Sequence, residues 1–483
     1  MNKSAKIVGR VSPSGRNPTS NVPAQGNVGL RPSVVSLSNQ EAANPTYGGM
    51  AGEWREVTLQ DAFEINPRRE IKRGTVTPFV PMDALPEHSR EIARIDEREF
   101  TGSGTRFKNG DTLLARITPC LENGKTAYVS GLEDDAVAHG STEYIVIAEK
   151  PNVSDSLFAY YFARSSEFRT FAIGHMEGTS GRQRVPTDAV AKFQFNLPSL
   201  AEQKAIAHIL GTLDDKIELN RRMNATLEAM ARALFQSWFV DFDPVRAKLD
   251  GRKPSGLDAV TAALFPAHFQ DTLLGHIPLG WEVCPLADKI ELLSGGTPKT
   301  GEPDYWDGDI PWFSVKDAPT ETDVWVIHTE KRVTELGISN SAAQVFPEKT
   351  TIITARGTVG KLALTGTPMA MNQSCYGVRG ITGYGDYFTY YSLRAATAQL
   401  QQHTHGTVFD TITRQTFETL NCIFPPPKLT AAFDIAVEPL LEQIRANLQQ
   451  SRTLATLRDT LLPKLLSGEL RVLGALIEEG LEL

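Results

Sequence analysis

Basic and amide side chains recur in short polar stretches of the sequence that have the chemistry to contact nucleic acid. These stretches are rich in glycine and threonine and separate β-branched runs, so we predict that they lie on turns. Arg, Lys, Asn and Gln side chains can hydrogen-bond to base edges in a DNA groove, and Gly-Thr turns let backbone amides approach phosphates. Each stretch by itself is more typical of a solvated turn. The candidate DNA-contacting residues are Arg68, Arg69, Lys72, Arg73, Arg116, Lys125, Arg182, Gln183, Arg184, Thr297, Lys299, Arg356, Lys361, Asn372 and Gln373.

The sequence shows no group of residues typical of an active site or a metal site. The stretches "NGKT" (residues 123–126) and "GTVGK" (residues 357–361) are similar to phosphate-binding loops, but that motif needs a glycine where Pro119 stands. We interpret both stretches as hairpin turns. The nine histidines follow no H-E-x-x-H or acid-paired spacing. We therefore predict that the chain is not an enzyme and itself binds no metal or cofactor.

The composition is that of a globular protein rather than of a self-sufficient nucleic-acid binder. The 483 residues are 41% hydrophobic and 22% charged, which allows about three domains with cores of their own. The net charge of −8 gives no overall attraction to nucleic acid, so such a role needs local patches or a partner's charge. No apolar run is long enough to span a membrane, which predicts a soluble, cytoplasmic protein. The cysteines show no C-x-x-C pairing and are predicted to be reduced thiols: Cys120, Cys284, Cys375 and Cys422.

The elements that would position the polar stretches begin near Trp54. Residues 1–52 are rich in Ser, Pro, Asn and Gly and bury too little apolar surface to order themselves, so we predict a disordered head. Residues 53–198 contain short β-branched and aromatic runs broken by turn residues. This pattern predicts a β-rich domain.

A long helix is predicted to follow this domain. Ser199 and Glu202 have the spacing of a capping box, and Gly211 is predicted to interrupt the helix soon afterwards. From Leu213 onward, apolar or asparagine residues recur in alternating steps of four and three, which is the spacing of a coiled-coil seam. The segment of about 28 residues ending near Pro244 would form a rod of about 42 Å. The seam residues are Leu213, Ile217, Asn220, Asn224, Leu227, Ala231, Leu234 and Trp238.

The whole pattern recurs later in the chain, which indicates an internal duplication. At an offset of 227, Thr212 falls opposite Pro439, which is predicted to begin a new helix. The stretch "LARIT" (residues 114–118) is similar to "TARGT" (residues 354–358). At the same offset the seam residues become Leu440, Ile444, Asn447, Ser451, Leu454, Arg458, Leu461 and Leu465, five of them unchanged in type.

We therefore predict an α+β fold in which two β-rich domains alternate with two long helices. Because neither helix can bury its seam alone, the two are predicted to form an antiparallel coiled coil with a pseudo-two-fold relation between the repeats. The β-rich domains would then sit at opposite ends of the helix pair. The predicted boundaries are a head at 1–52, a first domain at 53–198, a central helical region at 199–242, a linker at 243–279, a second domain at 280–427, a distal helical region at 428–470 and a tail at 471–483.

From Trp54 to Leu470 the chain resembles the specificity subunit of type I restriction-modification systems. The resemblance rests on the repeated plan, on the central region "LPSLAEQKAIAHILGTLDDKIELNRRMNATLEAMARALFQSWFVDFDPVRAK", and on "GRKPSGLDAVTAALFP", "SGGTPKTGEPDYWDGDIPWFS" and "LLPKLLSGEL". It implies a non-catalytic subunit whose two β-rich domains are target-recognition domains, each reading one half of a bipartite double-stranded DNA target. It also implies two methyltransferase subunits as partners, which methylate adenine at N6, together with ATP-driven restriction and translocase subunits. S-adenosylmethionine, ATP and Mg²⁺ would be bound by those partners.

Two hypotheses remain open from the sequence. In the first, the chain recognises DNA, and a rod slightly longer than one DNA turn of about 34 to 36 Å holds two recognition domains about a turn apart. In the second, the chain is a coiled-coil scaffold whose β-rich domains bind proteins and not DNA. In either case Asn220 and Asn447 are predicted to fix the register of the helix pair at some cost in stability, so their replacement by leucine would raise the melting temperature.

Overall fold

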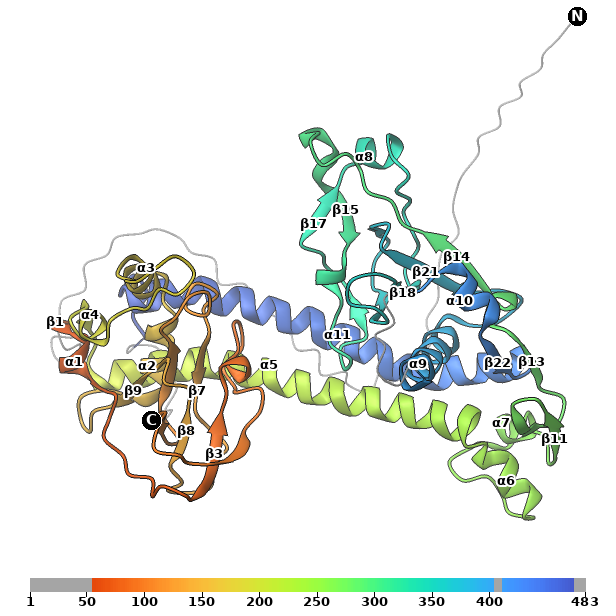
Figure 1. The fold of residues 1–483 in the computed structure, drawn as a ribbon, viewed down its shortest axis with the longest axis horizontal. Coiled ribbons are helices and arrows are strands. Elements are labelled where there is room, and N and C mark those ends of the chain that lie inside the picture. Colours follow the sequence, from red (N-terminus) through yellow and green to blue (C-terminus); the bar gives the residue numbers. More distant parts are fainter. Residues whose placement is uncertain (1–53, 404–410, 473–483) are drawn as a thin grey trace, which may run out of the picture. The chain divides into compact units, whose positions relative to one another are not determined.

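The computed structural model describes residues 54–403 and 411–472, and the side chains of all of these except 399–403. The predicted head at 1–52 and the part of the predicted tail beyond residue 472 lie outside the described residues. Within the described residues, two long helices and two β-rich domains account for most of the chain (Figure 1). The predicted fold class is therefore confirmed.

Helix α5 (Leu200–Phe235) is the first long helix and continues into a π-helical turn, η2 (Gln236–Val240). The hydroxyl of Ser199 accepts the amide of Glu202 at 3.3 Å, which is one half of the predicted capping box. The carboxylate of Glu202 does not return to the backbone of Ser199. It accepts the indole N–H of Trp54 at 2.8 Å instead, so the start of α5 is tied to the start of the first domain.

Neither predicted interruption of the long helices occurs. Helix α5 passes through Gly211, which is buried, and a Cβ there would lie 3.0 Å from a methyl group of Leu157. The glycine therefore serves close packing rather than a break. Helix α11 (Pro427–Leu466) likewise contains Pro439 and Pro463 in its interior. Both prolines are exposed, so water can bond the carbonyl groups that lose their helical partner.

The two long helices pack against each other in antiparallel orientation. Three contacts show this, because the residue number rises along α5 while it falls along α11. They join Asp214 to Arg458, Asn220 to Ser451 and Asn224 to Asn447. The predicted antiparallel helix pair is therefore confirmed.

The buried line on α5 coincides with the predicted seam only in part. Its most buried positions include Asp214, Glu228 and Phe235, each one residue beyond a predicted leucine. Helix α5 contacts the β-rich domains as well as α11, so its buried face is wider than a two-helix seam. Half of the predicted seam residues are buried, namely Asn220, Asn224, Ala231, Trp238, Ile444, Asn447, Arg458 and Leu465. The other half are half-buried, namely Leu213, Ile217, Leu227, Leu234, Leu440, Ser451, Leu454 and Leu461.

The first domain contains two four-stranded sheets and a strand pair that closes it. One sheet has the order β2–β9–β6–β7 and the other β4–β3–β8–β5, while β1 pairs with β10. The strands are β1 (Arg55–Thr58), β2 (Phe63–Ile65), β3 (Val76–Val80), β4 (Asp96–Glu99), β5 (Thr105–Phe107), β6 (Thr112–Ala115), β7 (Thr126–Tyr128), β8 (Ala138–Gly140), β9 (Tyr144–Glu149) and β10 (Gln194–Leu197). The helices are α1 (Leu59–Ala62), η1 (Met82–Ala84), α2 (Ser156–Arg164), α3 (Ser166–Gly174) and α4 (Thr187–Ala191).

A short helical linker and a hairpin connect α5 to the second domain. They comprise α6 (Asp243–Leu249), α7 (Ala259–Ala263), β11 (Phe269–Thr272) and β12 (Gly275–Pro278).

The second domain has sheets of the order β14–β21–β18–β19–β16 and β17–β15–β20, closed by the pair β13–β22. Its strands are β13 (Glu282–Pro285), β14 (Ile290–Ser294), β15 (Trp306–Phe313), β16 (Trp325–Val326), β17 (Lys331–Val333), β18 (Thr351–Thr354), β19 (Leu362–Thr365), β20 (Ala370–Met371), β21 (Cys375–Gly380) and β22 (Asn421–Phe424). Its helices are η3 (Leu286–Asp288), η4 (Pro303–Tyr305), η5 (Val315–Asp317), α8 (Glu335–Ser339), α9 (Asp386–His403) and α10 (Arg414–Thr419).

Four strands of one sheet and three of the other follow the same order in both domains, so the duplication extends to topology: β2–β9–β6–β7 matches β14–β21–β18–β19, and β4–β3–β8 matches β17–β15–β20. These matching orders also correct the alignment of "LARIT" with "TARGT". Arg116, directly after β6, donates its amide to the residue that precedes β9, and Ala355, directly after β18, donates its amide to the residue that precedes β21. Ala355 is thus the counterpart of Arg116, and Arg356 is the counterpart of Ile117. The sequence alignment is one residue out of register, and in extended backbone such a shift turns a side chain to the opposite face.

Each domain packs against both helices at one end of the pair. In the first domain, one apolar cluster joins the sheet β2–β9–β6–β7 and α2 to Leu210 of α5 and Leu465 of α11. In the second domain, another cluster joins α9 and the sheet to Phe235 of α5 and Phe433 of α11. The domains therefore occupy opposite ends of the antiparallel helices, as predicted.

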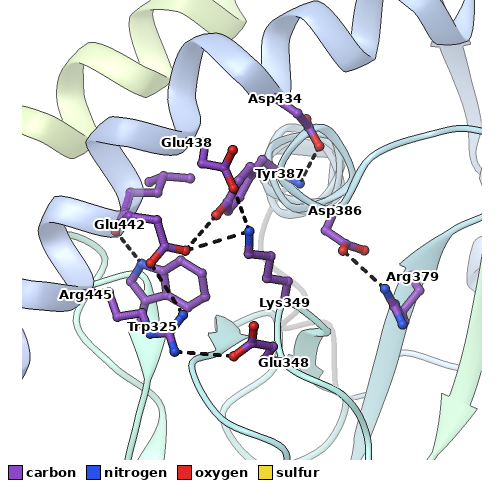
Figure 2. A network of polar contacts seen from close by, with 11 residues as sticks. Trp325, Glu348, Lys349, Arg379, Asp386, Tyr387, Asp434, Glu438, Glu442 and Arg445 are labelled. Carbon is purple, nitrogen blue, oxygen red and sulfur yellow. Dashed lines mark hydrogen bonds and ion pairs between the residues drawn. The ribbon is translucent and has the colours of Figure 1, made fainter. Parts of the chain in front are cut away.

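Polar contacts add to this packing at the second domain (Figure 2). The ammonium group of Lys349 lies 2.8 Å from the carboxylate of Glu438, and the hydroxyl of Tyr387 donates to Glu442 at 3.1 Å. The buried indole N–H of Trp325 donates to a main-chain carbonyl of α11 at 2.8 Å. Burial raises the pKa of Tyr387, so it remains a proton donor to Glu442. These bonds fix the orientation of the second domain on α11.

Candidate nucleic-acid interface

In the first domain, the loop after β6 lies beside the segment that leads into α4. Arg184 forms antiparallel β-bridges with Ile117 on one side and Glu177 on the other. The carbonyl of Gln183 accepts the amide of Thr118 at 3.0 Å, and the carbonyl of Arg116 accepts an amide from the same segment at 2.9 Å. The structure thus brings Arg116, Gln183 and Arg184 together from positions almost 70 residues apart, with their backbones held in place.

The side chain of Arg184 forms an ion pair with Glu143. Its Nε lies 2.9 Å from both carboxylate oxygens, and its Nη2 lies 2.7 Å from Oε1. The hydrogen bonds to Glu143 raise the pKa of Arg184. Glu143 was not among the candidates, because an acidic residue 41 positions away carries no local signal that it faces an arginine.

Three other candidates in the first domain contribute to the fold. The guanidinium of Arg69 forms a bidentate ion pair with the buried carboxylate of Asp111, with one bond of 2.7 Å. Burial raises the pKa of Asp111, and Arg69 opposes that effect. Lys125 donates to a main-chain carbonyl of η1 at 3.1 Å, and Arg116 donates to the hydroxyl of Thr187 at 3.4 Å. Arg69 and Lys125 therefore have their charged groups occupied within the domain.

The remaining cationic candidates are exposed and form no ion pair with any other described residue. Their charges are therefore available to solvent or to a ligand. They are Arg68, Lys72, Arg73 and Arg182 in the first domain, and Lys299, Arg356 and Lys361 in the second.

In the second domain, the loop after β14 and the turn before β21 touch each other. The hydroxyl of Thr297 bonds to the side chain of Gln373. The backbone approach is close, since a Cβ on Gly295 would lie 2.0 Å from the carbonyl oxygen of Asn372. Only glycine fits there. The structure thus brings together Thr297, Asn372 and Gln373, while Arg356 forms a β-bridge with Thr411.

Buried charges between the helices and the domains are a feature that the sequence pattern did not reveal. Arg458 of α11 lies 2.5 Å from Asp214 of α5, and both side chains are at most 7% exposed. The hydroxyl of Tyr161 in α2 donates to the second oxygen of Asp214 at 2.7 Å. At the other end, Arg394 of α9 lies 2.7 Å from Glu228 of α5. Burial raises the pKa of Glu228, and the arginine opposes it.

The polar triad at the first domain has an apolar counterpart at the second. At the repeat offset of 227, Asp214 corresponds to Leu441 and Arg458 to Ala231, both buried. The stretch "FAYYFAR" of α2 (residues 158–164) matches "FTYYSLR" of α9 (residues 388–394), so Tyr391 corresponds to Tyr161. The buried hydroxyl of Tyr391 has no hydrogen-bond partner among the described residues. The two ends of the helix pair are therefore chemically distinct, although their folds match.

Metal-binding and membrane-spanning features are absent from the described residues. The described residues contain no group of three or more His, Cys, Asp or Glu side chains placed to hold a metal ion. No described helix is long and apolar enough to cross a membrane. A cavity of about 710 Å³ lies between α5, α9 and the loop after β18. Its charged lining consists of Arg232, Glu321, Lys361 and Arg394, of which Arg394 is paired with Glu228 and Glu321.

Comparison with known proteins places this geometry in a family. A family model described as "Type I restriction modification DNA specificity domain" matches residues 51–229 and 278–429. The type I restriction enzyme HindI specificity subunit of Haemophilus influenzae is 29% identical over 463 residues, which cover 86% of this chain and 100% of that protein. The MjaIX specificity subunit of Methanocaldococcus jannaschii is 27% identical over 442 residues, which cover 88% of this chain and 95% of that protein.

Among solved structures, the S subunit of a type I restriction-modification system from M. genitalium shares the fold. It is 15% identical, with a TM-score of 0.52, and the match covers 86% of this chain and 96% of that one. The two ranges matched by the family model include both β-rich domains and most of α5, which is more than half of the chain. The chain therefore belongs to the type I restriction-modification DNA specificity family.

Proposed function

We propose that this chain is the DNA-recognition subunit of a type I restriction-modification complex and that each β-rich domain reads one half of a bipartite target. One observation carries the proposal: the two domains share a topology but present different side chains on equivalent loops. Arg184 and Glu143 of the first domain correspond to Thr411 and Ser374 of the second. Domains that share a scaffold and differ at these loops are suited to reading two different sequences.

The helix pair would set the separation of the two half-sites. Helix α5 has 36 residues, so it is about 54 Å long, longer than the rod expected from the seam alone. Because each domain is fixed to one end of the pair by apolar packing and by buried polar contacts, the helices act as a spacer of defined length. That arrangement suits a target with two specific parts and a non-specific spacer.

We further propose that the chain works with two methyltransferase subunits that modify adenine at N6, and with ATP-dependent restriction subunits. The specificity subunits of H. influenzae and M. jannaschii are by name parts of type I restriction enzymes. A net charge of −8 also favours a partner that supplies phosphate-neutralising charge. In this proposal the chain itself is non-catalytic, and S-adenosylmethionine, ATP and Mg²⁺ are bound by the partner subunits.

DNA affinity measured with and without the methyltransferase subunits tests the proposal. Fluorescence anisotropy on double-stranded DNA over a range of salt concentrations should show binding by the complex, with a steep salt dependence. Lys299→Ala should weaken that binding, whereas Arg252→Ala, an exposed arginine in the linker, serves as the matched control and should not. A complex without salt-dependent affinity for DNA would favour the alternative, a coiled-coil scaffold that binds proteins.

A further inference from the structure

The contact between Glu143 and Arg184 leaves one edge of the guanidinium group free. An arginine side chain carries five N–H donors in a planar fork. Glu143 occupies the edge formed by Nε and Nη2, through bonds of 2.7 and 2.9 Å. The carbonyl oxygen of Arg182 lies 3.4 Å from Nη1, and this is the only other acceptor of the side chain among the described residues. One N–H on each terminal nitrogen therefore remains for a bidentate partner.

The free edge is accessible and has a defined direction. The side chain of Arg184 is 45% exposed, whereas that of Glu143 is 23% exposed. A paired guanidinium group has lost most of its rotational freedom before a ligand arrives, so less entropy is lost on binding. The edge left by Glu143 has the geometry that matches O6 and N7 of guanine in the major groove.

The backbone beneath Arg184 is also fixed. Its amide donates to the carbonyl of Glu177 at 2.8 Å, and the amide of Glu177 donates to the carbonyl of Arg184 at 2.9 Å. On the other side the residue bridges to Ile117 in the loop after β6. Glu143 stands directly before β9 and is held through its carbonyl, which accepts the amide of Arg116 at 3.0 Å. Both members of the pair are thus held in place by backbone hydrogen bonds to neighbouring segments.

The second domain does not repeat this pair. The bridge between Ile117 and Arg184 corresponds to the bridge between Arg356 and Thr411, so a threonine stands in place of the arginine. The residue before β21 that accepts the equivalent amide is Ser374, so the carboxylate is also absent there. A role for the pair in base recognition is therefore confined to the first half-site.

We propose that Arg184 reads a guanine in the half-site recognised by the first domain, and that Glu143 is the positioning residue that orients it. This inference rests on the proposed function and adds to it the class of base contacted and the two residues involved. Arg184 donates two hydrogen bonds to guanine through its terminal nitrogens. Glu143 holds the opposite edge, neutralises the guanidinium charge in part, and so reduces attachment of Arg184 to phosphates of any sequence.

The test uses the full chain in complex with its methyltransferase subunits and a double-stranded DNA library in which every position of the target is varied. Methylation of the library, read by sequencing, gives the preference at each position. The wild-type complex should prefer guanine at one position of the first half-site by roughly 10- to 100-fold. Arg184→Ala should abolish that preference and leave the second half-site unchanged, and Arg184→Lys should fail to restore it because lysine has no fork.

Glu143→Gln separates positioning from folding. The preference for guanine should fall by several-fold at that one position while preferences elsewhere are retained. Arg182→Ala, which removes a neighbouring exposed arginine without an ion-pair partner among the described residues, is the matched control. It should weaken all sequences equally and lower the salt slope by about one.

The possible outcomes distinguish the proposed function from the guanine contact of Arg184 and from the positioning role of Glu143. A wild-type complex with no two-part motif overturns the proposed function. A two-part motif in which Arg184→Ala changes no guanine preference leaves that function standing and overturns this inference. An equal loss at every position of both half-sites in Glu143→Gln would overturn the positioning role of Glu143, since it indicates a folding defect.

Discussion

Replacing Arg458 by methionine should be among the most destabilising single changes in the helix pair. Arg458 and Asp214 are 7% and 5% exposed, and the bond between them is 2.5 Å long. Without the arginine, the carboxylate of Asp214 stays buried, and the hydroxyl of Tyr161 is its one remaining side-chain hydrogen-bond partner among the described residues. Leaving one member of a buried ion pair uncompensated costs about 3–5 kcal/mol. The free energy of unfolding should fall by that amount.

Replacing Asp214 by leucine as well should largely restore the stability that Arg458→Met loses. At the other end of the helix pair, Leu441 and Ala231 stand in the equivalent positions, so the fold accepts an apolar contact there. In the double variant Asp214→Leu with Arg458→Met, neither charge of this ion pair remains. The remaining cost is that of the Tyr161 hydroxyl losing its acceptor, about 1–3 kcal/mol. The double variant should therefore be more stable than Arg458→Met alone.

Urea denaturation measures the free energies, and hydrogen exchange of peptides from α5 and α11 locates the change. The exposed pair of Asp250 and Arg252, 2.8 Å apart with side chains 57% and 67% exposed, is the control. Its removal should cost less than about 1 kcal/mol. If Arg458→Met costs no more than this control, or if the double variant is less stable than Arg458→Met, the reasoning about the buried pair is wrong.

Three further changes have defined outcomes. Asn447→Leu removes the side-chain donor that lies 2.9 Å from the buried side-chain oxygen of Asn224. Thermal unfolding should show a loss of stability of about 1–3 kcal/mol, contrary to the gain expected from the sequence. An unchanged or higher melting temperature would show that the seam relaxes around leucine. Trp325→Phe loses the bond of 2.8 Å to the carbonyl of Leu441 and should cost about 1 kcal/mol in urea, and no loss would mean that water replaces the indole. Burial raises the pKa of Asp434 from 3.8 to about 7. Between these pH values the folded chain retains a proton that the unfolded chain has released. The free energy of unfolding therefore falls by up to about 1.4 kcal/mol per pH unit as the pH rises through that window. Asp434→Asn should flatten this part of the pH profile of urea unfolding, and a profile like that of the wild type would assign the dependence to other groups.

The existence of the helices and of the duplication could be predicted because both signals extend over many residues. A seam that extends over about seven helical turns outweighs local helix-breaking residues. Gly211 costs a helix about 1 kcal/mol and an interior proline such as Pro439 about 3 kcal/mol, and both sit in helices of 36 and 40 residues held by long packed faces. Local propensity therefore predicted breaks that tertiary packing removed.

The exact buried face of α5 could not be predicted, since a heptad pattern assumes a single partner helix. Asp214 and Glu228 look like solvent positions in the sequence, yet both are buried because an arginine from another element lies beside each. Arg458 lies 244 residues from Asp214 along the chain. No local pattern indicates such a pairing.

The candidate DNA-contacting residues were chosen by type, and type alone does not separate ligand contacts from structural ones. Arg69 forms an ion pair with Asp111, 42 residues further along the chain, and Lys125 donates a hydrogen bond to a main-chain carbonyl. Arg182 and Lys299 lie on exposed loops, as the composition of these stretches indicated. The pairing of Arg184 with Glu143 required the sheet, which places the residue before β9 next to the segment before α4.

DNA methylation in cells is the most direct test of the central claim that one chain reads a two-part target with one domain for each part. Sequencing that detects N6-methyladenine would compare cells that carry the gene with cells from which it is deleted. The expected result is a motif of two short specific parts separated by a spacer of fixed length, lost on deletion and altered in one part only by Arg184→Ala. A contiguous motif, or methylation that does not depend on the gene, would contradict the claim.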